Sequence, residues 1–590
     1  MNKPHTFYKT QIEKYNESLK KIKRQLTISS TIRLILFLAI CTAVYFTFGQ
    51  AKLVIGIIIF GIAAFIYLVS KHSDLQYKRD LLIAIIAQNG TELQILERAF
   101  HHLPDGSAYK NPLHEFSQDI DLFGRGSFFQ YCNRTALESG SDLFANLLTE
   151  NSIKNIPQKQ EAVKELANFP EWRQRFSAIA SLVKTEVPAN NIIHWLENYK
   201  PFAPKWIKPV SIGFSVISLA LILAYFTDFI SGYFVFGWFF IGLIISGRYL
   251  KKVNELASAT DKIQSTFEQF YKLISEIETQ EFSSELLSEK RNSVVNSNKK
   301  ASEALKKFAK NLDDLDQRSN LLVGIFGNGF MLRDTMQAFK IEKWISENKQ
   351  NVANWFEVIS FFDAYNSLGN YAFNHPNQVF PKITDNETVL NAENAAHPLL
   401  NNKTAVRNNI VIKDEQFFII TGANMAGKST FLRTVALQIV MGNVGLPTNS
   451  EKVSYSPIKL ITSMRTTDSL TDDESYFFSE LKRLKFIVES IKTDRYFIIL
   501  DEILKGTNST DKAIGSRKFV EKLVKSGSTG IIATHDLSLC EVANELPQVK
   551  NYYFDARIEN DELYFDYTFK EGICQNMNAS FLLKKMEIVD

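Results

Sequence analysis

Four long apolar segments interrupt a chain whose other residues mix polar and apolar positions, and these segments come in two pairs. Residues 34–48 and 53–69 form the first pair, and residues 210–226 and 230–245 form the second. None of the four contains Asp, Glu, Lys or Arg. A core helix rarely lacks charge on every side over four or five turns, and each segment approaches the roughly 20 residues that cross a bilayer. The pattern therefore predicts four transmembrane helices in two hairpins.

Positive charges flank both pairs on their outer sides, whereas the short turns within the pairs carry only Lys52. Since Lys and Arg concentrate on the cytoplasmic side of membrane proteins, we expect both turns outside and the rest of the chain inside. The sequence thus predicts a multi-pass protein of the cell inner (plasma) membrane with a cytoplasmic C-terminal domain. The flanking residues are Lys20, Lys21, Lys23, Arg24, Arg33, Lys71, Lys78, Arg79, Lys205, Lys208, Arg248, Lys251 and Lys252.

The composition places few further limits on function. The 67 Lys and Arg nearly balance the 64 Asp and Glu, for a net charge of +3, so whole-chain electrostatics gives no argument for nucleic acid. One local stretch, residues 290–310, is basic. It is interpreted either as a solvated helix face or as a contact for a phosphate backbone. The four cysteines lie far apart, which is typical of free thiols in a reducing compartment.

The clearest chemical motif lies at residues 417–430, where an apolar strand runs into Gly-x-x-x-x-Gly-Lys-Ser and then into a helical pattern. This strand–loop–helix context predicts a P-loop whose backbone amides hold the phosphates of ATP. Lys428 is expected to reach the β- and γ-phosphates, and the Ser429 hydroxyl to bind Mg²⁺. The predicted nucleotide-binding residues of this loop are Gly422, Ala423, Asn424, Met425, Ala426, Gly427, Lys428, Ser429 and Thr430.

Two later strands end in polar residues suited to the same chemistry. Residues 496–500 are apolar and close in Asp501 and Glu502, and residues 530–534 run into His535. Asp501 is expected to hold Mg²⁺ through water, and Glu502 to orient or deprotonate the attacking water. Polar residues at the C-terminal ends of parallel strands share one edge of a sheet. His535 is therefore a candidate sensor of the γ-phosphate.

These motifs together resemble the MutS family of ATPases. The resemblance implies Mg²⁺-dependent ATP hydrolysis in a homodimer, in which Ser475 would act on the ATP bound by the partner subunit and Asn408 would belong to the nucleotide site. Weaker similarity at residues 121–135 and 156–166 resembles the family's helical core. The segments that carry the resemblance are residues 421–430, Asp501-Glu502-Ile503 with Gly506, Thr507 and Asp511, Ala533-Thr534-His535, residues 475–480, Ala396-His397-Pro398-Leu399-Leu400 and Asn408.

Some features depart from the family. No segment resembles the mismatch-recognition domain, and we expect a membrane-anchored variant that lacks it, with no recognisable C-terminal dimerisation tail. Leu504, Lys505 and Lys512 stand where the family has Gly, Arg and Gly.

The predicted fold class is an α/β P-loop ATPase domain of the ABC or MutS type, preceded by an all-α core and lever region and four transmembrane helices in two hairpins. The predicted divisions are a cytosolic segment 1–30, hairpin 31–70, helical core 71–207, hairpin 208–247, helical lever region 248–385 and ATPase domain 386–590.

Three functions are compatible with this organisation. The leading hypothesis is a membrane-anchored, dimeric ATPase that runs a clamp or switch cycle, with DNA as a candidate partner and no small-molecule substrate beyond ATP. The alternative is a membrane ATPase that remodels or signals to a protein partner without DNA. An ABC transporter is disfavoured, because the chain has no Leu-Ser-Gly-Gly-Gln signature.

Overall fold

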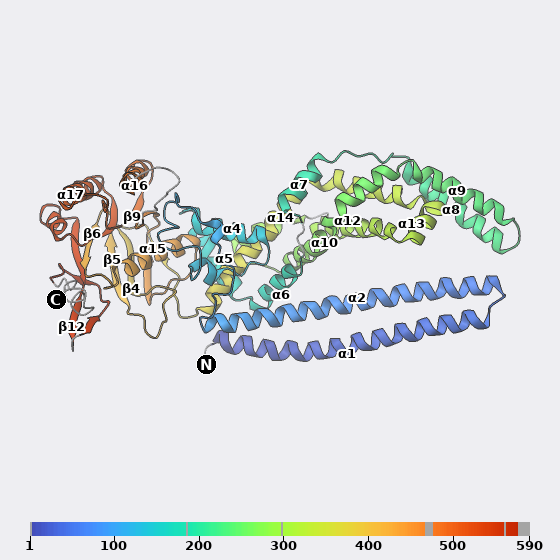
Figure 1. The fold of residues 1–590 in the computed structure, drawn as a ribbon, viewed down its shortest axis with the longest axis horizontal. Coiled ribbons are helices and arrows are strands. Elements are labelled where there is room, and N and C mark those ends of the chain that lie inside the picture. Colours follow the sequence, from blue (N-terminus) through green and yellow to red (C-terminus); the bar gives the residue numbers. More distant parts are fainter. Residues whose placement is uncertain (1–2, 184–186, 297–298, 466–475, 560–561, 576–590) are drawn as a thin grey trace.

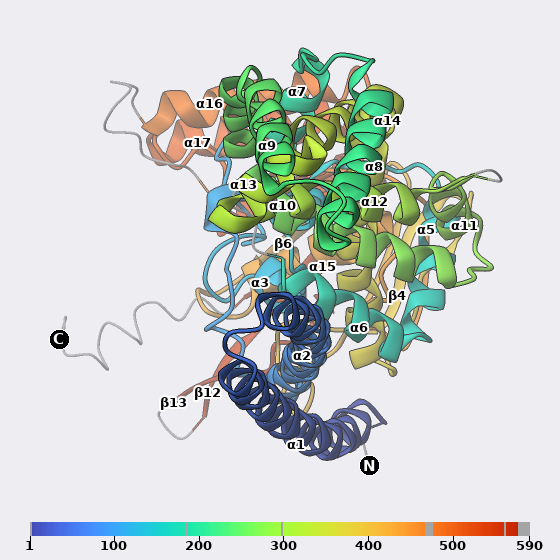
Figure 2. The same ribbon diagram turned by 90° about the vertical axis from the view of Figure 1, so that its right-hand side faces the viewer.

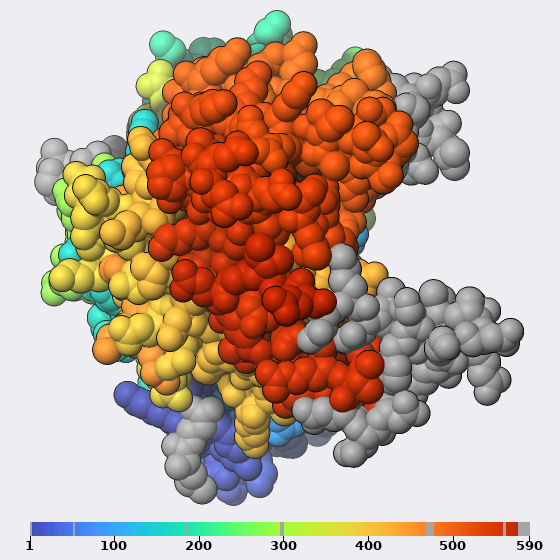
Figure 3. Space-filling model, turned by 90° about the vertical axis from the view of Figure 1, so that its left-hand side faces the viewer, coloured from blue at the N-terminus to red at the C-terminus, as the bar shows by residue number. Residues whose placement is uncertain are grey.

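The computed structural model describes residues 3–183, 187–296, 299–465, 476–559 and 562–575. An α/β domain occupies one end of the molecule and two helical hairpins reach toward the other, with a helical region between them (Figure 1). Seen from the α/β end, segments of that domain cover most of the molecule, and part of the first hairpin is visible beneath them (Figure 3).

The first hairpin consists of α1 (Lys3–Phe46) and α2 (Ala51–Leu96). Each helix continues far beyond its apolar run, so the expected divisions after residues 30 and 70 fall inside continuous helices. A helix of 44 residues is about 66 Å long, about twice the 30 Å hydrocarbon core of a bilayer. The start of α1 is held by Tyr8, whose buried hydroxyl donates to Asn374 Oδ1 at 2.7 Å.

The second hairpin consists of α8 (Ile207–Phe226) and α9 (Gly232–Gly247), close to the expected apolar segments. By length and composition, three of the described helices could cross a membrane, namely α1, α2 and α8. A fourth span is counted if α9 and α10 (Leu250–Thr279), which meet at a 64° bend, are taken together.

The region expected to be a charged lever also contains a short apolar helix, α13 (Leu321–Met331). The sequence analysis did not distinguish this helix from its surroundings. It packs on α8 and α9.

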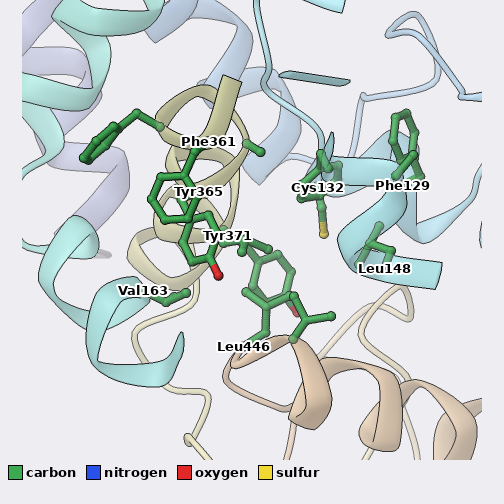
Figure 4. Close-up of a cluster of buried hydrophobic side chains, with 14 of the residues drawn as sticks. Phe129, Cys132, Leu148, Val163, Phe361, Tyr365, Tyr371 and Leu446 are labelled. Carbon is green, nitrogen blue, oxygen red and sulfur yellow. The ribbon is translucent and has the colours of Figure 1, made fainter. Parts of the chain in front are cut away.

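The helical region is organised around α14 (Arg333–Asn374), which packs against α4, α5, α10 and α12. Figure 4 shows side chains of α14 meeting residues of α3, α4 and α5 and Leu446 of the α/β domain in one buried cluster. A buried carboxylate, that of Asp363, accepts the Leu137 amide at 2.9 Å and the Ala136 amide at 3.0 Å. The other elements are α3 (Phe128–Cys132), α4 (Glu138–Thr149), α5 (Ile156–Ala167), α6 (Pro170–Ser181), α7 (Ala189–Asn198), α11 (Glu285–Asn292), α12 (Ala301–Asp316), β1 (Val295–Asn296) and β2 (Lys299–Lys300).

The α/β domain contains a six-stranded sheet in the order β14-β11-β6-β10-β9-β8. The five strands from β11 to β8 are parallel, so the C-terminal ends of β6, β9 and β10 lie at one edge. These strands are β6 (Phe417–Gly422), β8 (Lys459–Ser463), β9 (Tyr496–Asp501), β10 (Thr529–Ala533), β11 (Val549–Phe554) and the antiparallel β14 (Lys570–Glu571).

A second sheet in the order β3-β7-β4-β5 lies in the same domain. Its first strand, β3, precedes the expected domain start at residue 386. The remaining elements are β3 (Lys382–Ile383), β4 (Thr388–Ala395), β5 (Asn408–Lys413), β7 (Lys452–Tyr455), β12 (Ala556–Glu559), β13 (Glu562–Phe565), α15 (Lys428–Val444), α16 (Tyr476–Ser490), α17 (Ser509–Lys525) and α18 (Val542–Glu545).

The two parts of the molecule share direct contacts. Lys159 of α5 donates to the carbonyl of Asn443 at the end of α15 at 3.4 Å, and Gln160 donates to the Pro381 carbonyl at 2.9 Å. Asp119 accepts the backbone amide of Arg465 at 2.9 Å. The helical region is therefore bonded to the helix that follows the predicted P-loop.

Candidate nucleotide site

The loop from Gly422 to Gly427 joins the fully buried strand β6 to α15. A Cβ on Gly422 would lie 2.6 Å from the Phe554 carbonyl oxygen, so a larger residue would collide with β11. Gly427 has φ +103°, a conformation that glycine adopts without strain. The loop thereby delivers the N-terminus of a 17-residue helix, with its unpaired amides and positive dipole end, to the sheet edge.

Lys428 is the first residue of α15, and its side chain folds back toward the loop. Its Nζ donates to the Gly422 carbonyl at 2.6 Å and to the Ala423 carbonyl at 3.0 Å. Nζ also lies 3.3 Å from His535 Nε2. Burial lowers the pKa of Lys428, and the carboxylates of Asp501 and Glu502 oppose that shift. The ammonium is therefore held at the loop by contacts that an incoming phosphate could replace.

Ser429 and Asp501 meet across the sheet edge. The Ser429 hydroxyl donates to Asp501 Oδ2 at 2.7 Å. Burial raises the pKa of Asp501, and the hydrogen bond from Ser429 lowers it. Within the described ranges no group of three or more His, Cys, Asp or Glu could hold a metal alone. A hydroxyl and one carboxylate nevertheless fit Mg²⁺, which binds few protein oxygens and completes its shell with water and substrate phosphates.

Glu502 lies between two basic side chains. Its Oε1 is 3.3 Å from His535 Nε2, and its Oε2 is 3.8 Å from Lys505 Nζ. Burial, followed by the charge on Lys428, lowers the pKa of His535, so the imidazole is neutral at pH 7. The Glu502 backbone has φ +50°, which is uncommon for a residue with a side chain. From this backbone position the carboxylate faces His535.

All of these groups border one cavity of about 700 Å³, a size within the range of small-molecule sites. Among the predicted nucleotide-binding residues, Gly422 and Ala426 are outside its lining. Asn408 lines it and also joins β5 to a later segment, because its Nδ2 donates to the Tyr567 carbonyl at 3.1 Å and its Oδ1 accepts the Phe569 amide at 2.8 Å. The other predicted residues in the lining are Ala423, Asn424, Met425, Gly427, Lys428, Ser429, Thr430, Asp501, Glu502 and His535.

Sequence reasoning missed several residues that line the cavity. Val406, Phe554 and Tyr567 line it, and no motif marks them in the sequence. Ser475, predicted to act on the partner's ATP, lies outside the described residues.

The helix that follows Ser475, α16, is bonded to this site by Glu480. This residue ends the segment 475–480 that resembles the family, but the sequence assigned it no role. The Glu480 side chain is 2% exposed. Its carboxylate accepts the Leu504 amide at 2.5 Å and the Lys505 amide at 3.0 Å. Leu504 has φ +59°, a strained conformation for a residue with a branched side chain. Glu480 therefore holds the strained segment that directly follows Glu502.

Comparison with known proteins agrees with the motif resemblance. Residues 418–586 match the family model MutS domain V. The chain is 30% identical over 244 residues to MutS protein homolog 4 of Homo sapiens, covering 39% of this chain and 25% of that protein. It is 32% identical over 219 residues to DNA mismatch repair protein MutS of Methanococcoides burtonii, covering 35% and 24%. The chain thus aligns with about a quarter of the length of these relatives. The predicted similarity to the MutS family is confirmed for this part of the chain.

Proposed function

We propose that this chain is a membrane-anchored, MutS-like ATPase that binds ATP with Mg²⁺ at the cavity between β6, β9 and β10. The observation that carries the proposal is the convergence of Lys428, the Ser429–Asp501 pair and Glu502 with His535 on one cavity, in a segment that matches MutS domain V.

Each group has a role that follows from its position. Lys428 exchanges its carbonyl partners for the β- and γ-phosphates, where an ammonium binds as a point charge. Ser429 and Asp501 would hold Mg²⁺, which when bound offsets phosphate charge. Glu502 orients the attacking water and accepts its proton. His535, adjacent to both Lys428 and Glu502, contacts the γ-phosphate.

The membrane anchor is supported by exposed apolar surface. In each of the helices α1, α2 and α8 we consider the most apolar stretch of 18 residues. The share of that stretch that is buried inside the protein is 0% in α1, 6% in α2 and 17% in α8. Contiguous apolar surface of this extent is rare on soluble proteins and marks a membrane or a partner. We place both hairpins in the inner (plasma) membrane and the ATPase domain in the cytoplasm, as the flanking charges indicate.

The ATPase cycle is proposed to run in a homodimer, with the helix that begins near Ser475 completing the site of the partner subunit. Two kinds of target remain candidates for the cycle. A clamp on DNA is suggested by the similarity to DNA mismatch repair protein MutS. A protein partner is the alternative. Within the basic stretch, Lys290 pairs with Glu357 at 2.6 Å and Arg291 donates to the Glu278 carbonyl at 2.9 Å, whereas Lys300, Lys306, Lys307 and Lys310 are exposed. Lys290 and Arg291 are thus already engaged within the protein.

Two substitutions test the nucleotide chemistry in the detergent-solubilised full chain. Lys428→Ala is expected to abolish tight binding of a fluorescent ATP analogue, because the ammonium at the loop is lost. Glu502→Gln is expected to keep binding and stop turnover. Lys518→Ala, on the exposed side of α17, is the matched control and should behave as the unmodified protein. Turnover at the unmodified rate in Glu502→Gln would refute the assignment of Glu502 as the base.

A further inference from the structure

The helix α13 exposes large apolar side chains although it lies outside both hairpins. It contains no Asp, Glu, Lys or Arg. Leu321 is 71% exposed, Leu322 65% and Phe326 53%. So much exposed apolar surface on an 11-residue helix requires an apolar neighbour.

The packing of α13 against the second hairpin is of the kind found between membrane helices. Gly329 meets Gly242 of α9 so closely that a Cβ on Gly242 would lie 2.2 Å from the Gly329 carbonyl oxygen. The ring of Phe239 covers Gly329, and its centroid lies 5.2 Å from that of the Phe330 ring. Small residues that let backbones approach are enriched where helices pack in lipid. The contact therefore joins α13 to the hairpin.

The backbone at the end of α13 is satisfied by the hairpin rather than by water. The last carbonyls of a helix have no partner within it. Here the Ser218 hydroxyl of α8 donates to the Phe330 carbonyl at 2.7 Å, and the Ser211 hydroxyl donates to the Met331 carbonyl at 2.7 Å. Bonding of this kind is what a helix end needs inside a bilayer, where no water is available to pair with it.

Charged residues flank both ends of α13 and are paired. Arg318, before the helix, lies 2.9 Å from Asp334, after it, and the two side chains are 17% and 7% exposed. Arg333 donates to the Asp314 carbonyl at 2.6 Å. Eleven residues span about 16 Å, roughly half of the 30 Å hydrocarbon core. The helix is therefore too short to cross the hydrocarbon core, and the charged residues nearest to it are paired within the protein.

We propose that α13 is a further membrane element, a half-length helix inserted beside the second hairpin into the cytoplasmic leaflet, with lipid acyl chains as the partner of its exposed face. The assignment rests on the proposed anchoring by that hairpin. Figure 2, viewed from the hairpin end, shows α13 beside α9. Both helices carry exposed large apolar residues, Leu322 and Phe326 on α13 and Phe236 and Phe240 on α9.

Fluorescence quenching in vesicles tests the proposal. Single cysteines are introduced at Leu322, at Ile217 on the exposed face of α8, and at Lys307 on the exposed face of α12, in a chain carrying Cys41→Ser because Cys41 is the exposed native thiol. Each variant is labelled with bimane and reconstituted into phosphatidylcholine vesicles. The quenchers are nitroxide-labelled acyl chains in the bilayer and iodide in the water.

We expect the labels at positions 322 and 217 to be quenched alike. Both should be quenched strongly by the nitroxide-labelled lipid, and iodide should quench both several-fold less than it quenches the label at position 307. If lipid quenches the label at position 217 but the label at 322 is quenched mainly by iodide, as at 307, the inference about α13 is wrong while the anchoring stands. If 322 is quenched by neither agent, protein covers α13 and the inference is also wrong. If lipid does not quench 217, the anchoring itself fails. A label at Phe326, also exposed on α13, repeats the test should the Leu322 variant not fold.

Discussion

Replacement of Glu480 by Gln gives the sharpest test of how the catalytic segment is held. The Glu480 carboxylate accepts the amides of Leu504 and Lys505 with its two oxygens. A glutamine side chain keeps one oxygen and presents an NH₂ group, which cannot accept. One amide in a buried site therefore loses its acceptor. The conformation of Leu504, which costs about 1–2 kcal/mol for a residue with a side chain, loses the contact that holds it.

The size of the effect follows from these contacts. A buried donor without an acceptor costs about 1–3 kcal/mol, which corresponds to roughly 5- to 150-fold in an equilibrium or a rate. Because Glu502 lies only two residues before Leu504, we expect Glu480→Gln to lower ATP turnover within that range. Binding of ATP should change little, since the Glu480 carboxylate bonds to the segment that follows Glu502, whereas the phosphates are expected at the loop before α15. Steady-state hydrolysis and binding of a fluorescent ATP analogue separate the two effects.

Two further variants make the test specific. Glu489→Gln alters an exposed carboxylate on the same helix, paired with Lys485 only at 3.8 Å, and should leave turnover unchanged. Leu504→Gly in the Glu480→Gln background should not recover turnover, because it relieves the strain of φ +59° but removes a side chain buried in the core, which costs more. If Glu480→Gln hydrolyses ATP as fast as Glu489→Gln, Glu480 does not position the catalytic segment.

Three further outcomes are expected. Since burial and Lys428 lower the pKa of His535, its ring should gain a proton only below pH 6.5; turnover should decline there, and the decline should move to lower pH in His535→Asn. A cysteine at Gln50 should react with an impermeant reagent added outside intact cells and one at Lys452 should not, and the reverse pattern would invert the topology. If Ser475 acts on the partner's ATP, co-expression of Ser475→Ala and Lys428→Ala chains, each inactive alone, should produce mixed dimers with one intact site. Random mixing should then restore up to about a quarter of the unmodified turnover per subunit. No recovery in verified mixed dimers would count against that role.

The sequence predicted elements whose signals are local. The second hairpin follows from two uncharged runs, and the nucleotide loop follows from glycines at fixed spacing between a strand and a helix. The length of α1 could also have been predicted, because no glycine and no proline other than Pro4 precedes Gly49, whose φ of +105° ends the hairpin arm. The apolar run marks only the last part of this long helix.

Other features depend on contacts between distant residues. The helix α13 is apolar in sequence but shorter than a membrane span, and its contacts with Ser211, Ser218 and Gly242 of the second hairpin are seen only in the fold. Glu480 belongs to a segment that resembles the family, but its partner, the Leu504 amide 24 residues away, is identified only by the fold. Such pairings arise from tertiary structure and leave no periodic trace in the sequence.

The helix α14 has a geometric consequence for the whole molecule. It is bonded at Asp363 to the amides of Ala136 and Leu137, about 16 Å from its end at Asn374 and about 45 Å from its start beside α13. If α14 pivots at Asp363, a displacement of its Asn374 end becomes a displacement roughly three times larger at its start. Shifts of about 1–2 Å at the Asn374 end, typical of packed helices during conformational change, would become excursions of about 3–6 Å at the start of α14, beside α13.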